Sequence, residues 1–124
     1  NFAILYLDVD HFKSINDRYG HVVGDRAIKR LAQILKSSVR DEDLVVRYGG
    51  DEFLILLKNT NRQVAEKILD RIMNTLRELD EFEFSLTISG GIEELKDIHG
   101  IVESLKSADD KMYNSKKMKK QAIS

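Results

Sequence analysis

Residues 47–57 read RYGGDEFLILL, and this stretch decides how the chain is expected to fold. Two carboxylates, Asp51 and Glu52, follow a glycine pair and precede an apolar run, and DLVVRY at 43–48 supplies a second run of β formers. Glycine pairs suit the positive φ angles of tight hairpin loops, which predicts a β-hairpin with GGDE at its turn. Adjacent carboxylates repel each other, so this turn is either well solvated or placed beside a cation.

The segments on either side of the hairpin predict the other elements. FAILYLDVD at 2–10 is typical of a buried strand, and this strand ends in acids. Glycines and apolar spacing predict a helix over 11–20 that stops at Gly20, a longer helix following Gly24, a helix over 62–79, a strand over 82–92 and a helix over 101–117. The order βααββαβα predicts an α/β (α+β) fold, with a mixed, largely antiparallel sheet flanked by helices.

Length and composition favour one globular domain over residues 1–124. The chain is 42% hydrophobic and 33% charged, and it contains no proline or cysteine. The lack of cysteine excludes disulfides, thiolate metal sites and cysteine nucleophiles. No apolar stretch has the length of a membrane span and no secretory signal opens the chain, so we expect a cytoplasmic location without direct membrane contact. The first strand begins at once, with no helix ahead of it, which favours a fragment of a longer protein.

The net charge of −1 conceals an uneven distribution. Five lysines and no acids lie between residues 111 and 120, while acids gather in LDVD and GGDE. A basic tail and an acidic centre fit a polyphosphate bound through divalent cations better than they fit duplex DNA. A solvated helix end, where the helix dipole favours lysine, explains the tail more simply.

Asp8, at the end of the first strand, and Asp51, in the hairpin turn, are candidate metal ligands. Magnesium prefers hard oxygen ligands, typically one or two carboxylates together with phosphates and waters. If the two strands are neighbours, these acids converge as they do in sites that transfer phosphoryl groups with two metal ions. Asp10 lies on the same strand face as Asp8 and is a further candidate, although it can equally cap the next helix.

The stretch DVDHFKSINDRYGHVVGD at 8–25, followed by RYGGDEF at 47–53, resembles the GGDEF family of diguanylate cyclases. The resemblance continues through TISGGI at 87–92 to ADDKMYNSKK at 108–117, and so covers nearly the whole chain. It implies the palm-like sheet shared with class III nucleotide cyclases and some polymerases. The implied activity is the condensation of two GTP into cyclic di-GMP with release of pyrophosphate.

For catalysis, the resemblance implies two Mg²⁺ or Mn²⁺ ions in each active site. Asp8 and Asp51 are the implied metal carboxylates, and the Val9 carbonyl is a further implied ligand. Glu52 is implied to act at the attacking 3′-hydroxyl as a base, or to position a metal.

The resemblance also implies contacts with the nucleotide. Gly49 and Gly50 let the backbone approach it, which a side chain would obstruct. Asn16 and Asp25 are the implied readers of the base. Guanine offers N1–H and its 2-amino group side by side, a donor pair that one carboxylate accepts and that adenine lacks, so Asp25 favours GTP over ATP. Asp25 can also be the N-cap of the helix that follows Gly24.

The implied phosphate contacts lie at two places in the chain. Lys13 and the backbone amides of His11 and Phe12 stand at a helix start, which suits anions. Lys116 matches the family's phosphate lysine on the last helix. The family pattern continues with glycine, arginine and asparagine, but this chain reads KKMKKQ, which puts Lys120 in the place of the arginine. Arginine binds a phosphate with two N–H groups of its guanidinium, whereas lysine offers a single ammonium group. Lysine at this position is therefore expected to weaken phosphate binding.

RDED at 40–43 matches the family's product-inhibition motif, RxxD. Arg40 and Asp43 are the implied contacts with cyclic di-GMP, and Arg71 aligns with a secondary arginine of that site. Arginine suits guanine O6 and N7 as well as phosphate oxygens. A polar loop between a helix and a strand would read the same way, and RxxD alone is a weak signal.

We therefore expect a GTP-dependent diguanylate cyclase that is active only when two domains face each other about a two-fold axis. A missing sensor domain upstream is expected to drive that dimerisation. The alternative is a module that binds cyclic di-GMP or GTP without making product, and the altered KKMKKQ segment keeps it open. A nucleic-acid polymerase palm is poorly supported, because the short chain lacks basic or aromatic surfaces for a template.

Overall fold

The computed structural model describes residues 1–96. Its elements are β1 (Phe2–Val9), α1 (Phe12–Tyr19), α2 (His21–Ser37), β2 (Leu44–Arg47), β3 (Glu52–Lys58), α3 (Arg62–Arg77) and β4 (Ile88–Leu95). The predicted order is confirmed over this range, and the helix predicted over 101–117 lies outside the described residues. Within residues 1–96 no helix is both long and apolar enough to cross a membrane.

The four strands form one sheet in the order β2-β3-β1-β4, and every described pairing is antiparallel. This agrees with the predicted α+β fold and its largely antiparallel sheet. β1 lies in the middle of the sheet and is buried from Ala3 to Val9. A strand that is buried on both faces needs a continuous apolar sequence, and AILYL supplies one.

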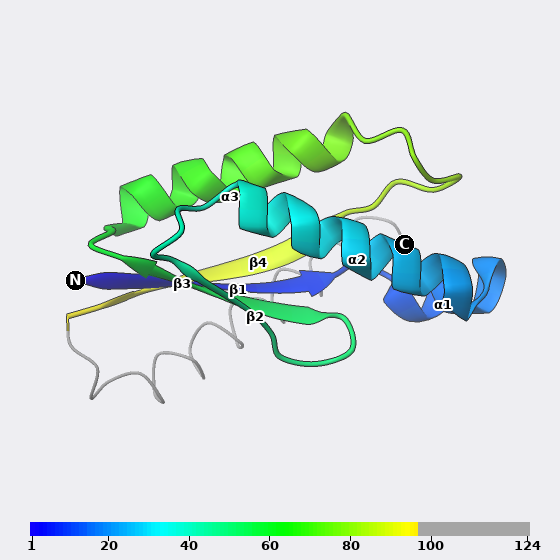
Figure 1. Ribbon diagram of the computed structural model, residues 1–124, viewed down its shortest axis with the longest axis horizontal. Coiled ribbons are helices and arrows are strands. Elements are labelled where there is room, and N and C mark those ends of the chain that lie inside the picture. Colours follow the sequence, from blue (N-terminus) through cyan, green and yellow to red (C-terminus); the bar gives the residue numbers. More distant parts are fainter. Residues whose placement is uncertain (97–124) are drawn as a thin grey trace, which may run out of the picture.

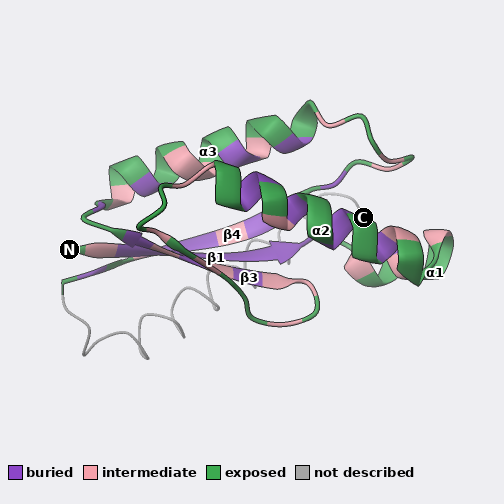
Figure 2. Ribbon diagram, viewed as in Figure 1, coloured by how far each residue is buried: buried purple, intermediate pink, exposed green. Residues whose placement is uncertain are grey.

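Helices α2 and α3 cover one face of the sheet (Figure 1). Both helices turn their buried residues towards the strands and their exposed residues outwards (Figure 2). The strand residues on this face alternate with those on the other face, as the pleat requires. The core contains Leu5 and Leu7 of β1, Phe53 and Ile55 of β3, Leu31 of α2 and Ile72 of α3.

The opposite face of the sheet changes from apolar to acidic along the strands. In the register of β1 and β3, Ile4 pairs with Leu56, Tyr6 with Leu54, and Asp8 with Glu52. Paired residues in an antiparallel ladder lie on the same face. The acidic end of this face therefore coincides with the end of β1 and the turn of the hairpin.

Two predicted boundaries are wrong. α2 begins at His21 and not after Gly24, so Asp25 lies inside the helix and is not its N-cap, which is Gly20. β4 begins at Ile88, although the alternation FEFSLT predicted a strand from residue 82. That alternation has another cause, because the Phe84 ring stacks on Phe82 and packs against Tyr19 of α1.

The conformation predicted for the hairpin glycines is also wrong. Neither Gly49 nor Gly50 has a positive φ angle; the glycine with one in the described part of the chain is Gly20, at φ 91°. Gly20 separates α1 from α2, and its N–H donates to the Asn16 carbonyl at 2.9 Å. An L-residue would be strained at that φ, so Gly20 has the conformational role that was expected of the hairpin pair.

Candidate active site

The end of β1 and the turn between β2 and β3 meet at one end of the sheet (Figure 1). Asp8 is directly opposite Glu52 in the ladder, and the Val9 N–H donates to the Asp51 carbonyl at 3.0 Å. The Asp8 residue is only 8% exposed. β1 and β3 are neighbours, which was the condition set for these acids to converge, and acids from two distant parts of the sequence therefore lie at one end of the sheet.

The turn itself is closed by backbone hydrogen bonds and by Arg47. The N–H groups of Tyr48 and Gly49 donate to the Glu52 carbonyl at 2.8 and 3.3 Å. The Arg47 guanidinium donates to the carbonyls of Gly49 and Gly50 at 3.2 and 2.6 Å. Sequence reasoning missed Arg47, although its place two residues before the first glycine of the pair was the available signal.

The two glycines of the turn have different surroundings. A Cβ on Gly49 would lie 2.8 Å from Oε2 of Glu52, so this glycine leaves room for the carboxylate. A Cβ on Gly50 would meet nothing within 4 Å. Gly50 is therefore the point of the turn that a ligand can approach most freely.

The donors at this end of the sheet fit Mg²⁺ that is shared with a phosphate ligand. Within residues 1–96 no three acidic or histidine side chains gather closely enough to enclose a metal ion. Mg²⁺ does not need such a cage, since one or two carboxylates suffice when substrate phosphates and waters complete the octahedron. Asp8, Asp51 and the Val9 carbonyl are hard oxygen donors of this kind.

Asp10 makes contacts that the sequence did not predict, and its role as a metal ligand stays a prediction. Its carboxylate accepts hydrogen bonds from the hydroxyls of Thr87 at 2.8 Å and Ser89 at 2.6 Å, and its N–H donates to the Thr87 carbonyl. The capping role is wrong, because the N-cap of α1 is His11. Asp10 ties the end of β1 to the start of β4, next to Asp8.

The start of α1 leaves its first turn open. His11 has left-handed backbone angles, φ 56° and ψ 34°, and its side chain makes no capping hydrogen bond. Phe12 and Lys13 form the first turn, and Lys13 is exposed. Uncapped N–H groups at a helix start, beside a lysine, suit an anion.

Asn16 packs against α2 at Gly24, where α1 meets α2. The Asn16 side chain lies against Gly24, the residue before Asp25: a Cβ on Gly24 would be 1.9 Å from Asn16 Oδ1. Asp25 is the next residue of α2 and is exposed. Lys116 and Lys120, the remaining predicted phosphate contacts, lie outside the described residues.

Comparison with known proteins identifies the family. Residues 1–122 match the family described as "Diguanylate cyclase, GGDEF domain". The chain belongs to the GGDEF family. "Diguanylate cyclase A" of Treponema denticola is 37% identical to this GGDEF domain over 119 residues, which are 92% of the chain and 32% of the relative. "Probable diguanylate cyclase DgcC" of Escherichia coli K12 is 41% identical over 93% of the chain and 32% of the relative.

Solved structures of the same family share the fold. The active GGEEF domain of a diguanylate cyclase from Vibrio cholerae has a TM-score of 0.86 and 30% identity, covering 94% of this chain and 76% of that one. The GGDEF domain of DgcB from Caulobacter crescentus, solved in complex with c-di-GMP, has a TM-score of 0.84 and 28% identity, covering 94% and 72%. The palm-like sheet is thereby confirmed, while this chain spans about a third of the length of the two curated relatives.

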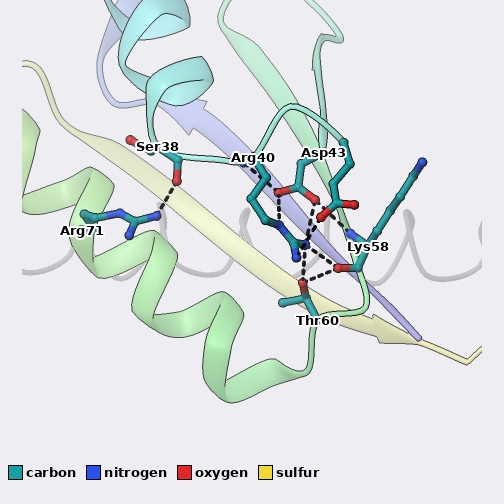
Figure 3. A network of polar contacts seen from close by, with 7 residues as sticks. Ser38, Arg40, Asp43, Lys58, Thr60 and Arg71 are labelled. Atoms are coloured by element: carbon teal, nitrogen blue, oxygen red, sulfur yellow. Dashed lines mark hydrogen bonds and ion pairs between the residues drawn. The ribbon is translucent and has the colours of Figure 1, made fainter.

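In this GGDEF domain the RxxD residues form a second polar cluster (Figure 3). Arg40 donates to both carboxylate oxygens of Asp43, through Nε at 3.1 Å and Nη2 at 3.0 Å. The N–H of Lys58 also donates to Asp43, at 3.1 Å, and Arg40 reaches the Lys58 carbonyl and the Thr60 hydroxyl. The pair therefore fastens the loop after α2 to the end of β3.

Arg71 reaches the same loop from α3. Its guanidinium donates to the carbonyl of Ser38 (Figure 3). Arg40 and Asp43 lie in the loop after α2 and Arg71 contacts the start of that loop, while their contact with cyclic di-GMP stays a prediction.

Charge and burial compete at Asp43, whose side chain is 1% exposed. Burial alone would raise the pKa of this carboxyl, but hydrogen bonds from the Arg40 side chain and from the N–H groups of Lys58 and Arg40 outweigh it, so the pKa is lowered. The same hydrogen bond to Asp43 raises the pKa of the Arg40 guanidinium. The ion pair is consequently fully charged at neutral pH.

Proposed function

We propose that this GGDEF domain is a diguanylate cyclase that condenses two GTP into cyclic di-GMP and two pyrophosphates. One observation carries the proposal: Asp8 faces Glu52 across the ladder while the Val9 N–H binds the Asp51 carbonyl. This arrangement collects carboxylates at one end of the sheet, and a triphosphate with its cations needs such a group. The relatives named as diguanylate cyclases support the same activity.

Each bond is made by attack of the 3′-hydroxyl of one GTP on the α-phosphorus of the other, and pyrophosphate leaves. In this proposal Glu52 accepts the hydroxyl proton, or it positions a metal. Asp8, Asp51 and the Val9 carbonyl would hold two Mg²⁺ or Mn²⁺ ions, which supply charge neutralisation on the triphosphate. Arg47 keeps the turn that carries both acids in one shape.

We propose that Asn16 and Asp25 bind the guanine base. The phosphates bind at the start of α1, to the amides of His11 and Phe12 and the side chain of Lys13. The close packing of α1 on α2 supports the first assignment and the uncapped first turn of α1 supports the second. Gly49 and Gly50 border the nucleotide in this arrangement. Lys116 and Lys120 are proposed to complete the phosphate contacts.

The two bonds of the product run in opposite senses between the same two nucleotides. Two copies of the domain therefore face each other about a two-fold axis, each holding one GTP, and a monomer is inactive. GTP as substrate favours a cytoplasmic setting, and the chain acts as the output of a longer protein that senses a signal.

We further propose that cyclic di-GMP inhibits the enzyme at Arg40, Asp43 and Arg71. The guanidinium groups of Arg40 and Arg71 are the proposed donors to phosphate and guanine, and the buried Asp43 carboxylate orients Arg40. The Caulobacter crescentus relative was solved with c-di-GMP, which supports a nucleotide ligand for the family.

The activity is tested by incubating the chain with GTP and Mg²⁺ at high protein concentration and quantifying cyclic di-GMP. Asp51→Ala removes a metal carboxylate and is expected to lower the rate at least 100-fold, because a missing charge contact in a phosphoryl-transfer site costs several kcal/mol. Glu66→Ala, which removes an exposed acid on α3, is the matched control and is expected to keep full activity.

If the wild-type chain makes no product, the assay is repeated with the chain fused to a dimeric coiled coil. Product that then appears, and vanishes with Asp51→Ala, supports the cyclase and its need for a dimer. If the fused chain binds GTP or cyclic di-GMP but forms no cyclic di-GMP, the proposal is wrong and the chain is a nucleotide-binding module.

A further inference from the structure

Gly24 is a buried glycine inside a helix, where glycine is a poor choice. It is the fourth residue of α2, and its φ angle is not positive. Only proline is less favourable than glycine in a helix interior, and alanine would fit this backbone better. The backbone conformation therefore does not explain Gly24, and its surroundings must.

The side chain of Asn16 occupies the space that a larger residue would need. A Cβ on Gly24 would lie 1.9 Å from Oδ1 and 3.0 Å from Cγ of Asn16, and 3.6 Å from Cε1 of Phe12. Asn16 Oδ1 is buried and accepts no hydrogen bond within residues 1–96. The amide is thus oriented there by the fit against Gly24.

The corner between the two helices gives this contact little freedom to relax. The Gly20 N–H donates to the Asn16 carbonyl at 2.9 Å, and the Gly24 N–H donates to the Gly20 carbonyl at 3.1 Å. These bonds fix the backbone of Asn16 relative to that of Gly24. A methyl group at position 24 would therefore move the Asn16 side chain rather than separate the helices.

We propose that Gly24 is a positioning residue: it seats the Asn16 amide beside Asp25 and so sets the affinity and selectivity for the guanine base. This inference rests on the proposed function, in which both side chains meet the base. An amide held there donates from Nδ2 to an acceptor on guanine, while Asp25 accepts from guanine donors. Adenine carries an amino group where guanine has O6, so the same amide does not favour it.

The test measures binding of 3′-deoxy-GTP and 3′-deoxy-ATP with Mg²⁺, because nucleotides without the attacking hydroxyl bind but do not react. The variants are Gly24→Ala, Asn16→Ala and the double variant, with Val22→Ala as a control at a position of α2 that is 76% exposed. Gly24→Ala is expected to weaken 3′-deoxy-GTP binding about tenfold, the effect of one lost hydrogen bond, and to leave 3′-deoxy-ATP binding within about twofold.

The double variant separates positioning from general damage. If Gly24 acts through Asn16, the double variant binds 3′-deoxy-GTP no worse than Asn16→Ala alone. The inference is wrong if the losses of 3′-deoxy-GTP affinity in the two single variants multiply in the double variant. It is also wrong if Gly24→Ala binds 3′-deoxy-GTP with wild-type affinity. If Asn16→Ala binds 3′-deoxy-GTP like wild type, Asn16 does not recognise guanine and the inference is wrong. The cyclase activity is tested separately by Asp51→Ala.

Two measurements without nucleotide test the contact itself. The side-chain amide NMR signal of Asn16, assigned by its absence in Asn16→Ala, is expected to shift in Gly24→Ala and to stay in place in Val22→Ala. If the Asn16 signal does not shift in Gly24→Ala, the proposal that Gly24 positions the Asn16 side chain is wrong. If Gly24→Ala does not fold, the double variant is expected to fold again, because the clashing side chain is gone; a double variant that stays unfolded also contradicts it.

Discussion

At the scale of single residues, Arg47 decides the shape of the turn that carries Asp51 and Glu52. Arginine presents several donors in a fixed planar fork, and here they bind two successive carbonyls. Neither glycine in this turn has the positive φ that was expected, so the turn is held by hydrogen bonds and not by glycine geometry alone.

Replacing Arg47 by Ala or Lys is expected to lower kcat for cyclic di-GMP synthesis by about 10- to 100-fold, since small misplacement of catalytic groups has effects of this size. Lysine cannot bind both carbonyls as the fork does, so it should rescue only partly. Steady-state kinetics check this, with Arg77→Ala on the exposed side of α3 as the control. Full activity of Arg47→Ala would show that the turn keeps its shape unaided.

The sequence was sufficient to predict the acidic residues of the site, but not the residues that hydrogen-bond to the elements carrying them. The motif marked Asp8, Asp51 and Glu52 because their spacing is distinctive. The bonds from Thr87 and Ser89 to Asp10 join positions nearly eighty apart in the chain, and only the register of β1 against β4 brings them together. Local patterns carry no information about such a pairing.

At the scale of elements, apolar periodicity predicted each described helix and strand but misplaced two starts. The segment before β4 alternates because Phe82 and Phe84 pack on each other and on Tyr19, and a stacked aromatic pair imitates a strand pattern. The start of α2 was misplaced because Gly24 was taken as a helix boundary. Its actual role, leaving space for Asn16, depends on a neighbouring helix and cannot be seen in a local window.

The loop between α2 and β2 gives a prediction about pH, through the charged pair that fastens it to β3. Asp43 has a lowered pKa when folded, while its unfolded pKa is near 4. Between these two values the unfolded state binds more protons, so stability rises with pH. The contribution of Asp43 is therefore present above about pH 4 to 5 and is lost as the pH falls through the folded pKa.

Urea unfolding of wild type and Asp43→Asn from pH 3 to 7 measures this contribution. The difference in unfolding free energy is expected to be constant near neutrality and to shrink below about pH 4. Asp41→Asn, an exposed neighbour, corrects for the general loss of one negative charge. A difference that does not change with pH would contradict the role of the Asp43 charge in holding the loop.

At the scale of the whole molecule, the two proposed nucleotide sites lie at opposite ends of β3. Glu52 begins this seven-residue strand and Lys58, which binds the RxxD pair, ends it. Seven residues of strand span about 20 Å, so one ligand does not occupy both sites. Inhibition by product at the proposed RxxD site would therefore act through the arrangement of domains or along the strand, and not by direct competition for the GTP site.

Arg71→Ala is the cleanest test of that inhibition. The only hydrogen bond described for its side chain is the one to the Ser38 carbonyl, whereas Asp43 also supports the fold, so Asp43 variants would mix two effects. Arg71→Ala is expected to raise the cyclic di-GMP concentration for half-inhibition about tenfold, the worth of one charge-assisted contact, with an unchanged initial rate. Inhibition at the wild-type concentration would remove Arg71 from the proposed site.

The burial of β1 on both faces has a consequence for how the chain tolerates insertions. Successive residues of a strand point to opposite faces, so a shift of one position would exchange them and send Asp8 into the helix-covered core in place of Leu7. The core would at the same time receive Tyr6 in place of Leu5. An insertion or deletion within Ala3–Leu7 would therefore disrupt folding rather than move Asp8 to a new position. The apolar side chains of β1 that stabilise the sheet thus also fix the position of the Asp8 carboxylate.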